Sequence, residues 1–177
     1  MNEKRYAHSI IVADIAKELA RRFNLDEEKA YLAGLLHDCA KDLDDEEMID
    51  AAIQAGITLT EVELSEPRSM LHPQVSAYIA QRDYGISDPD ILQAISYHQA
   101  GGVGMTSLDK IIGLADGTEP SRTEEYVENI REILKTDLDE AYLEKYSNNM
   151  ISVIQKRRVL DSVKAQVYNE LILQAGK

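Results

Sequence analysis

Apolar residues recur every three or four positions along most of the chain, and no run of alternating β-branched residues interrupts this pattern. The spacing is that of amphipathic helices, so we predict an all-α fold. In the first helix, His8 has the helical spacing of an apolar stripe, so we expect it to face the core. The stripe comprises Ile11, Val12, Ile15 and Leu19.

Capping residues divide the next part of the chain into two helices. Asp26 is the predicted N-cap of a second helix, with His37 on its apolar side and Asp38 next to it. A short third helix is expected over residues 45–55, because a glycine follows it. Residues 56–69 are rich in acidic and small side chains, and they predict a connection without a helix.

A fourth helix over residues 73–85 is expected to begin at its proline, because proline favours the first turn of a helix. This start places His72 at or just before the helix. Ser87 and Asp90 have the spacing of a capping box, which predicts a fifth helix over residues 91–98 that ends near a histidine.

Thr106 and Asp109 repeat the capping-box spacing ahead of a sixth helix that carries Asp116. Beyond it, residues 123–135 are expected to form another helix. A long amphipathic stretch follows an Asp137 N-cap. These C-terminal helices are expected to cover the core.

Length and composition indicate one domain. The 177 residues are 44% apolar, which is enough for a substantial core, and no linker or repeat divides them, so we predict a single helical-bundle domain over residues 1–177. No stretch approaches the roughly 20 apolar residues of a membrane span, and the N-terminus is polar. We therefore expect a cytoplasmic protein with no membrane partner. Cys39, the one cysteine, cannot form an internal disulfide.

The net charge of -13 argues against broad binding to nucleic acid, which depends on clustered Lys and Arg. A small phosphate ligand remains compatible with this charge if local cations reverse the field at its site. Bound divalent metal ions are the most economical source of such cations.

All four histidines stand where a metal site built on helices would need them, and two aspartates accompany them. Imidazole and carboxylate together suit iron, manganese, zinc or nickel, and one carboxylate can bridge two ions. Asp38 is the natural bridge because it directly follows a histidine. The candidate metal ligands, in chain order, are His8, His37, Asp38, His72, His98 and Asp116.

The segments around these residues resemble the HD superfamily. They read AGLLHDCAKD over 33–42, LH at 71–72, YH at 97–98 and LDKIIGLAD over 108–116. More narrowly, with EPSR over 119–122 and YNEL over 168–171, the chain resembles the bacterial YqeK family of symmetrical dinucleoside tetraphosphate hydrolases. The resemblance covers nearly the whole sequence, and it implies an HD-type helical bundle.

The resemblance also implies two metal ions, with iron the first choice. It implies His8, His37, Asp38 and Asp116 on one ion, and Asp38, His72 and His98 on the other. The implied reaction cuts diadenosine tetraphosphate at its centre to give two molecules of ADP. As a hypothesis, water activated between the two ions attacks a central phosphorus, and ADP leaves.

Positive side chains near the ligands are candidates for phosphate contacts. Lys41 lies one helical turn after His37, Arg68 precedes His72 by four residues, and Arg122 follows Asp116. With Asp38, we assign Lys41 and Arg122 to catalysis, and we assign Lys41, Arg68 and Arg122 to substrate binding. Each cation could instead be a surface residue paired with an acid.

Three positions depart from the family pattern. Gln99 and Ala100 replace the usual threonines after the fourth histidine, and Gly117 replaces a bulky residue after Asp116. Two alternative functions therefore stay open: another HD phosphohydrolase, such as a nucleotidase or a cyclic nucleotide phosphodiesterase, or a non-catalytic nucleotide-binding regulator. Apolar faces on the C-terminal helices could also pair two chains into a homodimer.

Overall fold

The computed structural model describes residues 2–160 and 162–176, and every regular element in those ranges is an α-helix, which confirms the predicted all-α class. None of the helices there combines the length and the apolar character needed to cross a membrane. The elements are α1 (Glu3–Arg22), α2 (Glu27–Leu36), α3 (Asp45–Gln54), α4 (Glu61–Ser65), α5 (Pro67–Tyr84), α6 (Pro89–Tyr97), α7 (Ser107–Thr118), α8 (Glu125–Ile133), α9 (Leu138–Gln155) and α10 (Ser162–Gln174).

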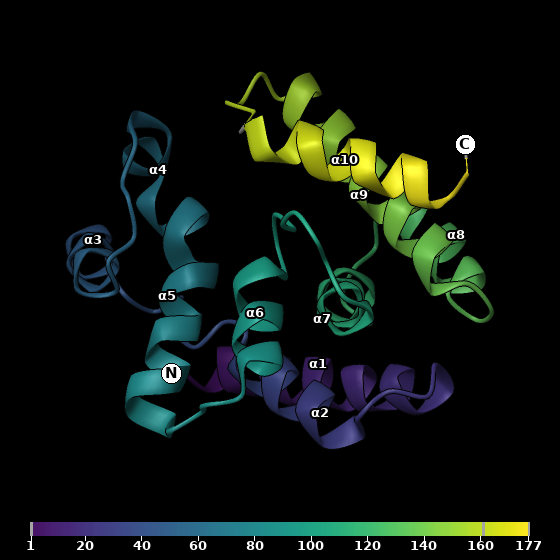
Figure 1. Cartoon of the computed structure of the whole chain (residues 1–177), viewed down its shortest axis with the longest axis horizontal. Coiled ribbons are helices and arrows are strands. Elements are labelled where there is room, and N and C mark those ends of the chain that lie inside the picture. Colours follow the sequence, from purple (N-terminus) through teal and green to yellow (C-terminus); the bar gives the residue numbers. More distant parts are fainter. Residues whose placement is uncertain (1, 161, 177) are drawn as a thin grey trace.

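Helix α7 occupies the centre of the bundle. Figure 1 shows it nearly end-on, between the α1 and α2 pair on one side and α8 and α9 on the other, with α6 beside it. Every residue from Leu108 to Ala115 is buried. The predicted capping box is present, because the Thr106 N–H donates to Asp109 Oδ2 at 2.7 Å and the Asp109 N–H donates to Thr106 Oγ at 3.4 Å. The side chains of Thr106 and Asp109 thus cap the N-terminus of this buried helix.

The predicted apolar stripe of α1 is confirmed in part. Val12 and Leu19 are buried, whereas Ile11 is 41% exposed and His8 is only half-buried. Small residues, including Ala13, share the buried face, and a Cβ added at Gly34 of α2 would lie 2.8 Å from Ala13 Cα. Close contact between the two backbones therefore favours small residues on the face of α1 that meets α2.

Helix α5 begins two turns earlier than predicted, at Pro67, so that Pro73 lies inside it. A proline within a helix leaves the carbonyl four residues earlier without its usual donor. Here that carbonyl belongs to Ser69, and the ring Nδ1 of His72 donates to it at 3.1 Å. The histidine thus satisfies the acceptor that the proline leaves free, and the helix continues.

Two other boundaries differ from prediction. Helix α4 lies in the segment expected to be a loop, where Thr60 and Glu63 form a capping box that the sequence reading missed. The prediction of a capping box at Ser87 is wrong, because Pro89 is the first residue of α6 and Asp88 is its N-cap. The predicted Asp26 and Asp137 caps are confirmed.

Helix α3 packs against α5 through a second apolar cluster, separate from the main core. Met48 of α3 and Leu71 and Val75 of α5 belong to it, together with Ala40, which follows α2. The Ala40 N–H also donates to Ser76 Oγ at 3.1 Å. These contacts hold the turn after α2 against the middle of α5.

Gly34→Ala tests the close packing of α1 on α2. Ala is the better helix former by about 1 kcal/mol, so this substitution would stabilise an unconstrained helix. We expect the opposite here, a loss of about 1–3 kcal/mol, because the new methyl meets backbone atoms of α1. Urea unfolding measures the difference, with Lys17→Ala on the exposed side of α1 as the control. A Gly34→Ala protein more stable than the wild type would contradict the packing argument.

Candidate metal centre

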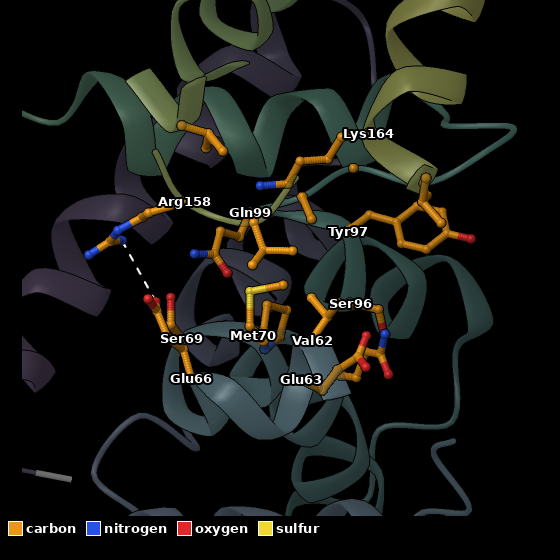
Figure 2. A pocket seen from close by; sticks show the side chains of 18 of the residues that line it. Val62, Glu63, Glu66, Ser69, Met70, Ser96, Tyr97, Gln99, Arg158 and Lys164 are labelled. Atoms are coloured by element: carbon orange, nitrogen blue, oxygen red, sulfur yellow. Dashed lines mark ion pairs between the residues drawn. The ribbon is translucent and has the colours of Figure 1, made fainter. Parts of the chain in front are cut away.

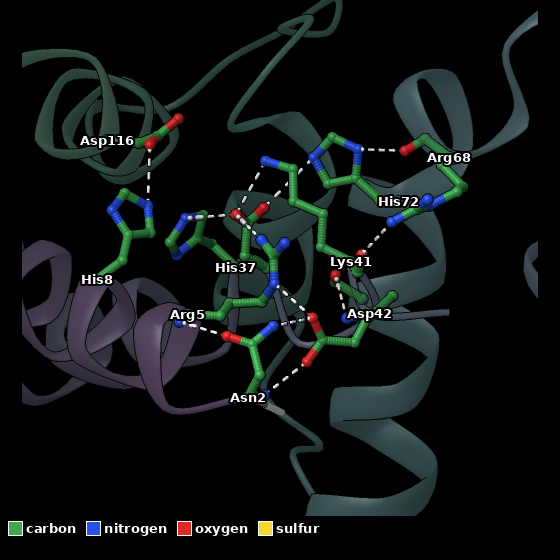
Figure 3. Close-up of polar contacts among 12 residues, drawn as sticks. Asn2, Arg5, His8, His37, Lys41, Asp42, Arg68, His72 and Asp116 are labelled. Carbon is green, nitrogen blue, oxygen red and sulfur yellow. Dashed lines mark hydrogen bonds and ion pairs between the residues drawn. The ribbon is translucent and has the colours of Figure 1, made fainter. Parts of the chain in front are cut away.

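Five helices bring the six predicted ligands together. His8 comes from α1, His72 from α5 and Asp116 from α7, while His37 and His98 stand directly after the last residues of α2 and α6. Asp38 follows His37. Figure 3 shows His8, His37, His72 and Asp116 pointing toward one region from different elements. Residues separated by more than 100 positions in the chain therefore share one site.

Each of three buried imidazoles has its Nδ1 bound to a backbone carbonyl. His37 Nδ1 donates to Gly34 O at 2.6 Å, His72 Nδ1 to Arg68 O at 3.0 Å and His98 Nδ1 to Ile95 O at 2.8 Å. A neutral ring that donates from Nδ1 has a lone pair on Nε2. All three rings therefore present an acceptor nitrogen to the centre, as metal-ligating histidines do.

Asp38 lies in the middle of these nitrogens. Its Oδ1 is 3.4 Å from His72 Nε2 and 3.6 Å from His98 Nε2, and its Oδ2 is 3.6 Å from His37 Nε2. His37 Nε2, His72 Nε2 and Asp38 Oδ1 are buried and have no hydrogen-bond partner. Buried polar atoms normally find a partner, so several unpaired acceptors that face one another fit a site for a cation.

Three overlapping triads within this cluster have ligand atoms close enough to hold an ion. They are His8, His37 and Asp38; His37, His98 and Asp116; and Asp38, His72 and His98. In each triad the atoms lie within 4.8 Å of one another. Two of the triads contain Asp38, so its two oxygens can serve two ions. The donors are nitrogen and carboxylate oxygen, which suit a divalent transition metal.

Burial sets the protonation states that a metal would need. Burial lowers the pKa of His37, and it lowers the pKa of His98 to about 3, with His37 and His72 adding to the effect. Burial tends to raise the pKa of Asp38, but the nearby His72, His37 and Lys41 outweigh it, and the pKa falls well below its usual range. The His37 and His98 rings are thus neutral at pH 7, and the Asp38 carboxylate is ionised.

Lys41 and an arginine absent from the sequence prediction reach the same carboxylate. Lys41 Nζ lies 2.9 Å from Asp38 Oδ2, and Arg5 Nη1 lies 3.3 Å from the same atom. Arg5 also bonds to Asp42 Oδ1 at 2.9 Å through Nε (Figure 3). Its position three residues before His8 on α1, on the same side of the helix, is the signal that could have identified it.

Arg122 contacts the other carboxylate of the cluster, that of Asp116. Its Nη2 donates to Asp116 Oδ1 at 2.7 Å, and its Nε lies 3.5 Å from the carboxylate of Glu119. Glu119 is almost completely buried and lies 3.9 Å from His8 Nδ1. Glu119 belongs to the EPSR segment but was not among the predicted site residues, although its spacing from Asp116 is close to one helical turn.

Arg68 is the third predicted phosphate contact, and it is exposed. Its Nη2 donates to the backbone oxygen of Lys41 at 3.4 Å, so the guanidinium lies beside the turn that carries Asp38. Lys110, by contrast, extends toward α9 and α10, where it pairs with Asp139 at 2.8 Å. Arg68 therefore belongs to the surroundings of the centre, and Lys110 does not.

Two pockets lie beside the centre. The larger, of about 430 Å³, is shown in Figure 2 and is lined by residues next to two ligands, among them Ser69, Pro73, Tyr97 and Gln99. The smaller, of about 120 Å³, is lined by Asp116, Gly117 and Arg122, and also by Gln99. The pockets adjoin at Gln99. The three positions that depart from the family pattern, Gln99, Ala100 and Gly117, thus line space next to the cluster.

Comparison with known proteins agrees with this geometry. The family model described as HD domain matches residues 5–121. Two relatives are named symmetrical bis(5'-nucleosyl)-tetraphosphatase. The one from Bacillus subtilis is 37% identical over 97% of this chain and 91% of the relative. The one from Staphylococcus aureus is 39% identical over 96% of this chain and 84% of the relative.

A solved structure from Clostridium acetobutylicum, described as a predicted HD superfamily hydrolase involved in NAD metabolism, has a TM-score of 0.93 and 37% identity. The match covers 98% of this chain and 92% of that one. These findings confirm the resemblance inferred from the sequence: the chain belongs to the HD domain family, within the group that contains the symmetrical bis(5'-nucleosyl)-tetraphosphatases.

Proposed function

We propose that this protein is a metal-dependent hydrolase that cuts diadenosine tetraphosphate, and similar dinucleoside polyphosphates, symmetrically into two nucleoside diphosphates. The observation that carries the proposal is the set of buried, unpaired acceptors on His37, His72 and Asp38, which face one another inside an HD domain. The names of relatives that match nearly the full chain supply the substrate class.

The proposed ligands divide into two sets that share Asp38. His8, His37, Asp38 and Asp116 would hold one ion, and Asp38, His72 and His98 the other, in keeping with two of the three triads. We propose two iron ions, although manganese, zinc or nickel would suit the same donors. When bound, such ions polarise phosphate oxygens and lower the pKa of water, so that hydroxide can attack phosphorus at neutral pH.

The chain's own cations would position the phosphates. Lys41 and Arg122 stand on two sides of the ligand cluster, and each contacts one of its carboxylates. In those places they can stabilise negative charge on the attacked phosphate and on the departing ADP, while Asp38 shapes the site as a catalytic ligand. A protein acid is less necessary, because ADP leaves as a stable anion.

The larger pocket would take one nucleoside end of the substrate. Its volume of about 430 Å³ is within the range of small-molecule sites, and the residues that line it flank His72 and His98 in sequence. A nucleoside there would leave its phosphates directed at the ligand cluster. The arrangement supports a small-molecule nucleotide as the partner of this site.

Product analysis tests the proposed reaction. We expect metal-loaded protein to convert diadenosine tetraphosphate to ADP alone, because attack at a central phosphorus divides the molecule into equal halves. Ion-exchange chromatography of the products over time measures this. Equal amounts of AMP and ATP would reject symmetrical cleavage, and the absence of any turnover would reject the hydrolase.

Asp38→Asn tests the shared ligand, with Asp42→Asn as a matched control, since both carboxylates contact Arg5 and only Asp38 faces the histidines. We expect Asp38→Asn to lose bound metal and at least ~100-fold in activity, because a neutral amide is a poor bridge. A chelator should lower the Tm of the wild type and of Asp42→Asn, but not that of Asp38→Asn. Elemental analysis that finds normal metal in Asp38→Asn would contradict the assignment.

Arg68→Met tests the phosphate contact predicted for α5. Its guanidinium is exposed beside Lys41, so we expect KM for diadenosine tetraphosphate to rise roughly threefold to tenfold, while metal content and Tm stay unchanged. Arg82→Met is the control, because Arg82 is also exposed on α5 but pairs with Asp83 away from the cluster. An equal KM in the two variants would assign Arg68 to the surface.

A further inference from the structure

Lys145, in the middle of α9, is a buried lysine that neither the sequence analysis nor the proposed mechanism uses. Its side chain is only 6% exposed. The other buried lysine, Lys110, pairs with the Asp139 carboxylate at 2.8 Å. Lys145 forms no ion pair within the part of the chain that the structure describes, and its ammonium lies 5.4 Å from the centre of the Tyr142 ring. A buried ammonium without a carboxylate opposes folding, so its presence calls for another explanation.

The side chain of Lys145 packs against two glycines of α7, one of them next to Asp116. A Cβ added at Gly117 would lie 2.7 Å from Lys145 Cε, and one added at Gly113 would lie 3.3 Å from Lys145 Nζ. The side chain of Lys145 thus occupies space that a larger residue at position 117 would fill. The position next to Asp116 has to remain a glycine for Lys145 to lie where it does.

Lys145 ends in the small pocket beside the ligand cluster. It lines this space of about 120 Å³ together with Asp116, Arg122, Glu124 and Gln99. The pocket is too small for a nucleoside, but it offers two cationic side chains next to a proposed ligand. Burial lowers the pKa of Lys145 to about 8, with Asp116 opposing that shift, so the ammonium is mostly charged at pH 7.

We propose that Lys145 is a further phosphate-binding residue of this site, which acts with Arg122 on the diphosphate that lies on the α7 side of the ligand cluster. The assignment rests on the proposed function for its substrate class. Lys145 supplies an ammonium that donates to phosphate oxygens, in a place where water is largely excluded and the interaction is weakly screened. A negative ligand also provides the counter-charge that the folded chain does not.

Lys145→Met tests this role, because it keeps the length and apolar stem of the side chain and removes the charge. We expect ADP, titrated calorimetrically into metal-loaded protein, to bind about tenfold more weakly, and KM for diadenosine tetraphosphate to rise by a similar factor. Metal content should not change, and Tm should stay the same or rise. Lys156→Met, an exposed lysine directly after α9, is the control and should bind ADP like the wild type.

Gly117→Ala provides a second, independent variant. Its methyl would displace the stem of Lys145, so we expect it to weaken ADP binding in the wild type and to have no further effect in a Lys145→Ala background. Equal ADP affinity of Lys145→Met and the wild type, or no ADP binding by the wild type, overturns the assignment. Failure of the proposed function would give a different result: the wild type would bind ADP but would not hydrolyse diadenosine tetraphosphate.

Discussion

A carboxylate buried among imidazoles is the interaction on which the rest of the structure depends. Asp38 has one oxygen held by Lys41 and Arg5, while its other oxygen faces His72 and His98 without a donor. Since burial keeps the pKa of the His98 imidazole low, this ring brings a lone pair rather than positive charge. Acceptors that face acceptors oppose folding until a cation lies between them, so ion binding and stability are coupled.

The orientation of the rings comes from backbone carbonyls that the helices cannot use. Gly34 and Ile95 lie in the last turns of α2 and α6, where carbonyl groups lack intrahelical donors, and Ser69 loses its donor to Pro73. An imidazole Nδ1 donates to each of these carbonyls. The same hydrogen bonds therefore satisfy backbone carbonyls of the helices and orient each Nε2 toward the centre.

The parts of this structure that the sequence predicts are those fixed by rare residues or local chemistry. The candidate ligands, which the structure brings together, were identified because histidines are few, and the Thr106 cap because it depends on neighbours three residues away. The start of α5 was missed because the His72 side chain donates to the Ser69 carbonyl that Pro73 leaves without a donor, so the helix tolerates an internal proline. Arg5 was missed although its spacing from His8 could have indicated it, and Lys145 was missed because only long-range packing distinguishes it from the other cations of the chain.

The distribution of charge also fits an acidic protein that handles an anion. The chain carries a net charge of -13, yet Arg5, Lys41 and Arg122 meet at the ligand cluster, each held by a carboxylate of Asp38 or Asp116. Metal ions bound by those carboxylates would compete with the Lys and Arg side chains, which would then be free to donate to phosphate. Under the proposed function, metal binding therefore does more than activate water, because it also converts a self-neutralised cluster into a positive site for a polyphosphate.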